Sequence, residues 1–323
     1  MRNKVRFFLG SSLLYCTCGL AQVDSLYIEK YAHTYGATLS LNQDFLSLKY
    51  EQEKEELVFE PNRPVKIGVA FAWKNSSLSY SHGFSGMSDK EKGKSSTVDF
   101  QYHLIGKKFM VDFYFQQYKG FYHFNEEMDM YQSYSDLRIN LYGGRYTYVF
   151  NSDRFSIGAA QNKNSRQRKS AGALLIGGSA FLSIIKNTPE LAEGVREHDS
   201  RRYIFGPTIG YGYNLVIRKK FLASLSVNVG LNGIFDENLS NKHTAFYVNG
   251  QIRSDINLSY QGDEWGGGMK SSLSGLYFNK VEDYSSQLLN TSLVFFVTKR
   301  FSLKKDPKIL QYDLIDLLDP SIY

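Results

Sequence analysis

A strict alternation of large apolar and small or polar residues constrains this chain more than any other feature. In the stretch VKIGVAFAWK (65–74), every second residue from Val65 to Trp73 is large and apolar, and the residues between are small or charged. A period of two points successive side chains to opposite faces, which predicts a strand with one apolar face. That face meets either the core of a soluble sandwich or the acyl chains of a lipid bilayer.

The same alternation recurs along the chain, at 97–105 and 107–118, at 203–217 and 221–233, and at 244–260. The second face carries mostly Gly, Ser, Thr, Asn and Gln with single charges, which suits a narrow polar lumen better than a surface in open water. The predicted lumen-lining residues are Asp99, Gln101, His103, Asp112, Gln116, Asn214, Ser224, Ser226, Asn228, Asn249, Gln251, Arg253, Asp255 and Asn257.

The connections between these stretches alternate between short turns and longer polar segments. Short turns on one rim and long loops on the other are typical of a barrel in an outer membrane. We therefore predict an all-β fold, an antiparallel transmembrane β-barrel with short periplasmic turns and longer extracellular loops. The count is about twelve strands, within a range of ten to fourteen.

Two places resist this pattern. Residues 154–186 are too long for one crossing of about ten residues, so either one strand extends well beyond the membrane or two strands occur there. At Gly143 and Gly144 the apolar positions change phase, which predicts a β-bulge.

The chain begins with MRNKVRFFLGSSLLYCTCGLAQ, a basic start followed by a short apolar run and small residues up to Ala21. This is the pattern of a secretory signal peptide, predicted to span residues 1–21. Its removal takes away both cysteines and three basic residues, so the net charge falls from +6 to +3, which argues against a nucleic-acid partner. We then expect a periplasmic segment at 22–36, the barrel at 37–303 and a periplasmic tail with a candidate short helix at 304–323.

Four stretches carry a resemblance to a known family: YKGFY (118–122), LYGGRYTYVFNSDRFS (141–156), QRKSAGALLIGG (167–178) and GPTIGYGYNLVIRKKF (206–221). In these the chain resembles a group of predicted outer-membrane proteins named domain of unknown function 4421, from about Tyr27 to Leu303. The resemblance implies a barrel in a Gram-negative outer membrane. It implies no known activity and supplies no catalytic residues.

His103 and Asp112 are weak catalytic candidates, because they share the inward face of one predicted hairpin. If 105–107 forms its turn, Gln101 lies opposite Asp112 and His103 lies on the diagonal. With a serine nearby, this pair suggests a hydrolase site of the kind used by lipid-modifying barrels. The alternative is a hydrogen-bonded network that fills the lumen.

Two clusters of charged residues are further candidates. Arg253 and Asp255 share one strand face, where they form either a selectivity element or an ion pair with neighbouring strands. Arg166, Arg168 and Lys169 form a basic cluster that, at the extracellular rim, would contact lipopolysaccharide phosphates; the alternative is a solvated loop.

No metal site or cofactor is expected, since the histidines are dispersed and no phosphate-binding Gly loop is present. The expected partners are outer-membrane lipid and the machinery that inserts barrels. Three functions remain open: a non-enzymatic structural barrel or narrow small-solute channel, a lipid-modifying barrel enzyme, and a surface interaction or adhesion protein.

Overall fold

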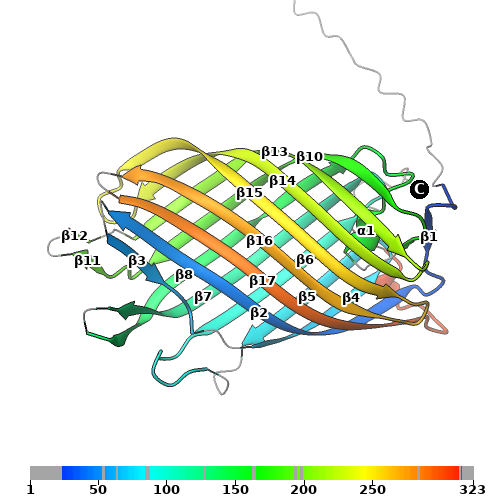
Figure 1. Ribbon diagram of the computed structural model, residues 1–323, viewed down its shortest axis with the longest axis horizontal. Coiled ribbons are helices and arrows are strands. Elements are labelled where there is room, and N and C mark those ends of the chain that lie inside the picture. Colours follow the sequence, from blue (N-terminus) through cyan, green and yellow to red (C-terminus); the bar gives the residue numbers. More distant parts are fainter. Residues whose placement is uncertain are drawn as a thin grey trace, which may run out of the picture.

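Twelve long strands form a closed antiparallel ring (Figure 1). The computed structural model describes residues 24–52, 55–62, 65–83, 88–126, 128–161, 165–192, 195–196, 199–281, 284–312 and 314. Consecutive strands of the ring are neighbours, and the last one pairs back with the first. The strands of the ring are β2 (Tyr35–Gln52), β4 (Lys66–Trp73), β5 (Ser76–Gly83), β6 (Ser96–Ile105), β7 (Phe109–Asn125), β8 (Met130–Val149), β10 (Ala171–Lys186), β13 (Ser200–Ile217), β14 (Phe221–Asn238), β15 (Thr244–Gln261), β16 (Trp265–Val281) and β17 (Tyr284–Phe301).

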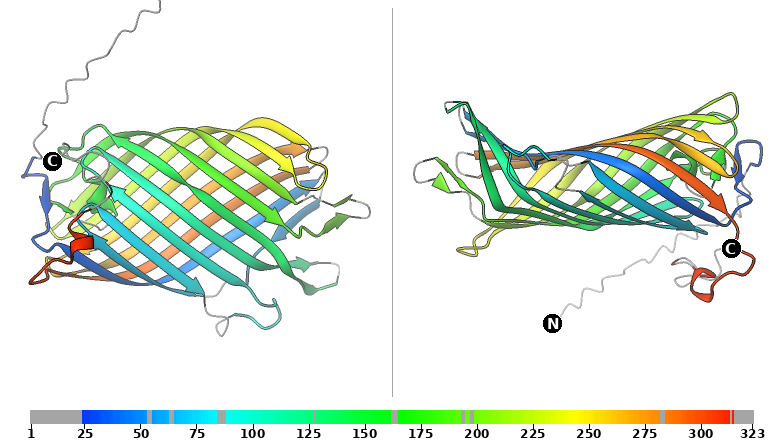
Figure 2. Two further views of the ribbon diagram at one scale, coloured as in Figure 1. Left: turned by 180° about the vertical axis from the view of Figure 1, so that it is seen from behind. Right: turned by 90° about the horizontal axis from the view of Figure 1, so that it is seen from below.

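This ring confirms the predicted antiparallel β-barrel of about twelve strands. Closure pairs the first strand with the last along seventeen consecutive partners, from Ser285↔Glu51 to Phe301↔Tyr35, so neither strand leaves an open sheet edge. The two views of Figure 2 show that the ring is flattened, which brings opposite walls close together.

The outer surface of the ring is apolar. Along β4, Ile67 and Val69 are 40% and 55% exposed, while the alternate residues Lys66 and Gly68 are buried. The same alternation places Leu231 (60% exposed) and Tyr211 (57% exposed) on the outside. Contiguous exposed apolar surface of this extent is not found on soluble monomers, so the exterior requires an apolar environment.

The two ends of the ring differ. The tight turns after β4, β6, β13 and β15 meet at one end, which we call the short-turn end, at the right of Figure 1. At the opposite, long-loop end lie β3 (Glu55–Phe59), which pairs with the end of β2, and the small hairpin of β11 (Glu190–Ala192) and β12 (Val195–Arg196).

A hydrophobic cluster fills the lumen toward the long-loop end. Its members point inward from strands on opposite sides of the ring, such as β2 and β10, so side chains that touch one another there close the interior. All are at most 8% exposed: Leu46, Leu48, Tyr50, Phe59, Tyr118, Phe121, Leu137, Ile139, Phe181, Ile185, Ile204, Ile234 and Leu288.

This cluster corrects the bulge predicted at Gly143 and Gly144. The register of β8 with both neighbours is unbroken there, and the irregularity lies at Gly120 on β7 instead. Ile139, inside the lumen, and Tyr146, outside it, obey one alternation. The apparent phase change has another cause: apolar residues occupy the inner face near the long-loop end and the outer face farther along the strand.

A segment of the chain plugs the short-turn end. Between β8 and β10 the chain enters the lumen and forms α1 (Ile157–Ala160) and β9 (Ser165–Gln167) (Figure 1). β9 pairs with β1 (Ile28–Lys30) from the N-terminal segment. Residues 154–186 are therefore neither one extended strand nor two strands, but this plug segment followed by the single crossing β10. The predicted number of twelve strands is therefore correct, because the residues between β8 and β10 fold into the lumen and add no crossing.

The remaining predictions concern the chain ends. The signal peptide expected at 1–21 lies outside the described residues. So does half of the tail at 304–323 with its candidate helix; the described half contains the 3₁₀ turn η2 (Lys308–Leu310). No helix among the described residues has the length and apolar character to cross a membrane.

Candidate functional site

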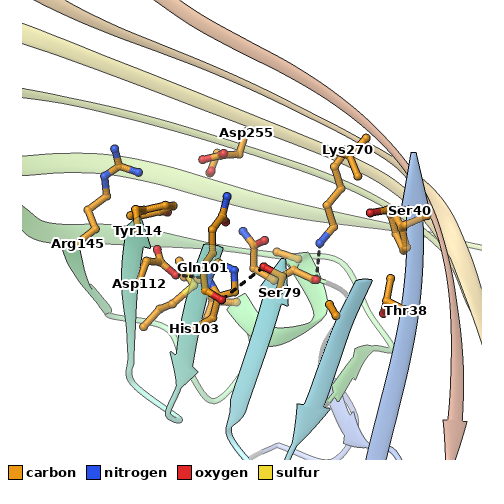
Figure 3. A pocket seen from close by; sticks show the side chains of 18 of the residues that line it. Thr38, Ser40, Ser79, Gln101, His103, Asp112, Tyr114, Arg145, Asp255 and Lys270 are labelled. Atoms are coloured by element: carbon orange, nitrogen blue, oxygen red, sulfur yellow. Dashed lines mark hydrogen bonds and ion pairs between the residues drawn. The ribbon is translucent and has the colours of Figure 1, made fainter. Parts of the chain in front are cut away.

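The inner faces of the strands enclose two adjoining polar cavities, of about 240 and 210 Å³. Figure 3 looks into the larger one, toward which labelled side chains of β2, β5, β6, β7, β8, β15 and β16 converge. The residues shared by both linings are Asp99, Gln101, Tyr114, Arg145, Ala160, Gln161, Ser224, Ser226, Arg253, Asp255, Lys270 and Val294. We call this pair of cavities the lumen cavity.

The alternation placed the predicted lumen residues on the inner face. Eleven line the lumen cavity: Asp99, Gln101, His103, Asp112, Gln116, Ser224, Ser226, Asn228, Arg253, Asp255 and Asn257. Asn214 is fully buried against the plug, where its amide donates to the Ser156 carbonyl and to Gln167 Oε1, both at 3.0 Å. Asn249 and Gln251 share the inward face of β15 with Arg253, nearer the long-loop end.

His103 and Asp112 form a direct pair rather than a diagonal one. The turn between β6 and β7 is centred one residue later than predicted, so His103 lies opposite Asp112 and Gln101 lies opposite Tyr114. The His103 Nδ1 atom is 2.7 Å from Asp112 Oδ1, and the two side chains are 16% and 4% exposed. A carboxylate at Nδ1 fixes the tautomer of an imidazole and leaves Nε2 for another partner.

Ser79 faces the same cavity as His103 and Asp112 (Figure 3). Its hydroxyl is 3.5 Å from the Gln101 carbonyl, which is the hydrogen bond that this hydroxyl makes among the described residues. A serine nucleophile is instead activated by a hydrogen bond to its base. His82 is on the outward face of β5, whereas Ser79 and Ser81 are on the inward face, so His82 does not share this cavity with the two serines.

The carboxylates of the lumen cavity all have partners. Asp255 bonds Arg253 on its own strand through two contacts of 2.7 and 2.6 Å, so the pair does not reach to neighbouring strands as predicted. Asp44 pairs with Lys66, which is 2% exposed. Asp99 accepts hydrogen bonds from the amides of two glutamines, at 2.9 Å from Gln101 and 3.2 Å from Gln116.

Arg145 has a different environment. Its guanidinium lies beside two neighbouring aromatic rings, 5.6 Å from the centroid of Tyr114 and 5.4 Å from that of Phe181. Within the described part of the chain it makes no hydrogen bond and no ion pair. Sequence reasoning missed Arg145 because a bulge at Gly143 and Gly144 would reverse which of the following side chains point inward. Without the bulge, the alternation that begins at Ile139 places Arg145 in the lumen.

The plug is held by polar contacts and by a hydrophobic cluster in which Phe155 and Ile157 pack against strand residues such as Leu175. The buried Gln167 side chain accepts from the Ser156 backbone N–H (2.9 Å) and donates to the Arg154 carbonyl (2.5 Å). Strands β15 and β16 bind the end of α1: Asn257 donates to the Ala160 carbonyl at 2.8 Å, and Lys270 Nζ donates to that of Gln161 at 2.6 Å. Such contacts position the plug but are individually weak, about 1 kcal/mol net for each neutral bond.

The basic cluster of Arg166, Arg168 and Lys169 belongs to this plug. Arg166 Nε is 2.7 Å from Glu29 and its Nη1 is 2.6 Å from Asp263, while Arg168 is 2.5 Å from Glu29. Lys169 lies over an aromatic ring at 5.4 Å. These residues are at the short-turn end, which corrects their expected position on the long-loop rim, and two of them are neutralised by carboxylates.

A further cavity of about 230 Å³ opens at the short-turn end beside the plug; we call it the mouth cavity. Its charged lining residues are Lys30, Lys74 and Arg300; no carboxylate is among its described lining residues, but Asp306 accepts a hydrogen bond of 2.8 Å from the lining residue Tyr35. The mouth and lumen cavities share three lining residues, Thr38, Ala70 and Thr298. The hydroxyls of Thr38 and Thr298 are 2.8 Å apart, so a hydrogen-bonded pair stands between the two spaces.

Comparisons with known proteins give one family and several distant folds. The family model described as Domain of unknown function (DUF4421) matches residues 22–301. No curated protein matches the chain.

Similar solved structures are barrels of low similarity. The toluene transporter TodX of Pseudomonas putida is 8% identical, with 84% of this chain and 91% of that chain covered and a TM-score of 0.32. The β domain of the Bordetella autotransporter Brka is 9% identical, with 83% and 100% covered and a TM-score of 0.42. The translocator domain of the autotransporter NalP from Neisseria meningitidis is 12% identical, with 83% and 89% covered and a TM-score of 0.42.

Proposed function

The chain belongs to the family described as Domain of unknown function (DUF4421), and from this premise we propose that it is a non-enzymatic outer-membrane barrel that forms a gated, narrow passage for small polar solutes. The proposal includes export through the N-terminal signal peptide, insertion by the barrel-assembly machinery and contact with membrane lipid. The short-turn end then faces the periplasm and the long-loop end faces outward.

The membrane assignment rests on the exterior of the ring. Large apolar side chains cover the outer faces of the strands, and aromatic rings pair toward both ends. Near the short turns, the ring centroids of Phe221 and Tyr260 are 5.5 Å apart. Toward the long loops, those of Phe235 and Phe246 are 4.8 Å apart. Apolar bands flanked by aromatic rings are typical of barrels whose ends lie at the two membrane surfaces.

The single observation that carries the passage is a polar lumen cavity held between two closures of different kinds. A cavity with this many polar groups in its wall suits water or a small polar solute rather than a packed core. The hydrophobic cluster at the long-loop end resembles a constriction that stops conduction by excluding water. The plug at the short-turn end combines polar contacts with a hydrophobic cluster that includes Phe155 and Ile157, and the mouth cavity runs beside it.

The test is single-channel conductance of the folded chain and of variants that loosen each closure. The variant Leu48→Ser puts a hydroxyl into the hydrophobic cluster, where Leu48 is fully buried, and Gln167→Ala removes the central side chain of the plug. We expect a silent wild type, rare openings for each single variant, and frequent discrete steps when both substitutions are combined.

The matched control is Leu231→Ser, the same chemical change on the outer surface, which should leave the wild-type silence unchanged. All forms must first show the heat-dependent gel shift of a folded barrel. A folded double variant that inserts and yet conducts no better than the control would refute the passage.

A second candidate, a hydrolase, is favoured by one observation: Ser79, His103 and Asp112 face one cavity (Figure 3). That cavity is inside the lumen, so membrane lipid on the outer surface does not reach it. The Ser79 hydroxyl also donates to a backbone carbonyl rather than to His103. Covalent labelling by a small fluorophosphonate that disappears in Ser79→Ala would support the enzyme, and equal labelling of both proteins would exclude Ser79.

A further inference from the structure

Arg145 is the least expected charge in the lumen. A guanidinium removed from water is costly unless a carboxylate or several acceptors compensate it. Here the compensation within the described residues is two aromatic faces, at 5.6 and 5.4 Å. The centroids of the two rings are only 6.0 Å apart, so both rings lie on one side of the guanidinium, and Arg145 borders both halves of the lumen cavity.

The acidic side chains nearby do not form an ion pair with Arg145. Asp112, directly opposite Arg145 across β7 and β8, bonds His103, and Asp255 bonds Arg253 through two contacts. Both carboxylates are thus already engaged, while the donors of Arg145 are unused. The lumen therefore offers a positively charged, planar donor group to whatever enters it.

The entrance has the same sign of charge. Lys30, Lys74 and Arg300 line the mouth cavity without a carboxylate among its described lining. On the neighbouring turn, burial and then the charge of Lys108 lower the pKa of Lys107, Asp153 opposes this effect, and Lys30 adds to it. An excess of basic groups in the wall of an opening raises the local concentration of anions.

Entrance and lumen are joined. The mouth and lumen cavities meet at Thr38, Ala70 and Thr298, where one hydroxyl–hydroxyl bond of 2.8 Å separates them. The mouth cavity is therefore the side from which an anion would approach the lumen cavity next to the plug.

We propose that the solute of this passage is a small organic carboxylate, and that the edge of the Arg145 guanidinium binds its carboxylate group with two parallel hydrogen bonds. The inference rests on the proposed function and adds the chemical class of the solute. Guanidinium and carboxylate match in planarity and spacing. A doubly charged anion fits less well because Asp112 and Asp255 are close by, and the lumen cavity of about 240 and 210 Å³ admits only small molecules.

The test is ¹⁹F NMR of trifluoroacetate with the folded full-length chain in detergent micelles. Trifluoroacetamide, which has nearly the same shape but no charge, is the matched probe. We expect saturable line broadening with trifluoroacetate alone. The variant Arg145→Gln should weaken this binding by about tenfold to a hundredfold, because two charge-assisted bonds are lost. Arg145→Lys keeps the charge but not the planar arrangement of donors, so its affinity for trifluoroacetate should lie between those of the wild type and Arg145→Gln.

Arg201→Gln, an equal change of charge on the outward face of β13, is the control and should bind as the wild type does. The Gln167→Ala variant is measured in parallel so that slow entry does not hide the site. Binding that survives Arg145→Gln, equal binding of trifluoroacetamide, or no binding by either the wild type or the open-plug variant would overturn the assignment. Conductance of the double variant described above is independent of this result, so the passage and its solute are tested separately.

Discussion

At the scale of single residues, the lumen contains two kinds of charge. His103 and Asp112 satisfy each other at 2.7 Å, as do Arg253 and Asp255 at 2.6 and 2.7 Å. Arg145 does not have such a partner among the described residues. Paired charges stabilise the closed lumen, whereas the unpaired one is available to a solute.

The paired charges give a test of stability. Replacing His103 with Gln removes the imidazole from Asp112, whose side chain is only 4% exposed. A buried carboxylate that loses a hydrogen-bond partner costs about 1–3 kcal/mol. We expect the urea midpoint of the barrel in lipid vesicles to fall accordingly, as followed by the heat-dependent gel shift.

The control for this prediction is His243→Gln, since His243 is exposed in the connection between β14 and β15. It should change the free energy of unfolding by less than about 0.5 kcal/mol. Equal midpoints for the two variants would mean that the His103–Asp112 bond does not contribute to stability.

Alternation predicts which way a residue points much better than what it touches. It placed VKIGVAFAWK with its apolar face outward and eleven residues around the lumen cavity. It did not predict the His103–Asp112 pairing, because a one-residue shift of a turn moves the register by two. Arg145 was missed because an apparent phase change was attributed to a bulge.

At the scale of elements, the plug is the part that sequence reasoning could not resolve. Residues 151–170 have neither a period of two nor a period of 3.6. Their structure depends on partners far away in the chain, such as Asn214, Asn257 and Lys270. Local pattern carries no information about such contacts, so an inward insertion was read as additional strand.

The plug should loosen in acid. Chiefly through its hydrogen bond, Arg166 holds the pKa of Glu29 below its ordinary value of 4.5, against the opposing effect of burial. A carboxylate with a lowered folded-state pKa contributes stability above its unfolded pKa and loses it as the pH falls through the folded one. Amide hydrogen exchange in β1 and β9 should therefore be constant, after correction for intrinsic rates, from about pH 7 to 5 and accelerate below 4.5.

The matched variant is Glu29→Gln, which cannot titrate. Its β1 and β9 amides should exchange faster than those of the wild type at neutral pH and show no further acceleration from this group in acid. Equal protection in both proteins at every pH would mean that the charge of Glu29 does not contribute to the stability of the plug.

At the scale of the whole molecule, connection lengths were enough to count the crossings. The short turns after β4, β6, β13 and β15 fall at one end, and the ring has the expected twelve strands. The closure of the long-loop end was not predicted. Inward apolar residues such as Leu48 and Ile139 become recognisable as a core only when strands from opposite walls face each other.

The whole account depends on the outer surface of the ring being in lipid. The two tryptophans of the chain report on this without substitution. Trp73 ends β4 and Trp265 begins β16, each next to a tight turn at the short-turn end, and Trp265 is 54% exposed. Tryptophans at barrel ends lie near the headgroups, where their rings are amphipathic anchors.

The most direct measurement is the quenching of this fluorescence by lipids that carry bromine at different depths, compared with quenching by iodide in water. If the outer surface of the ring is in lipid, we expect strong quenching by bromine near the headgroups, weaker quenching by bromine at the chain ends, and little quenching by iodide. Full quenching by iodide with none by brominated lipid would place the apolar faces against protein or water, and the barrel would not span a membrane.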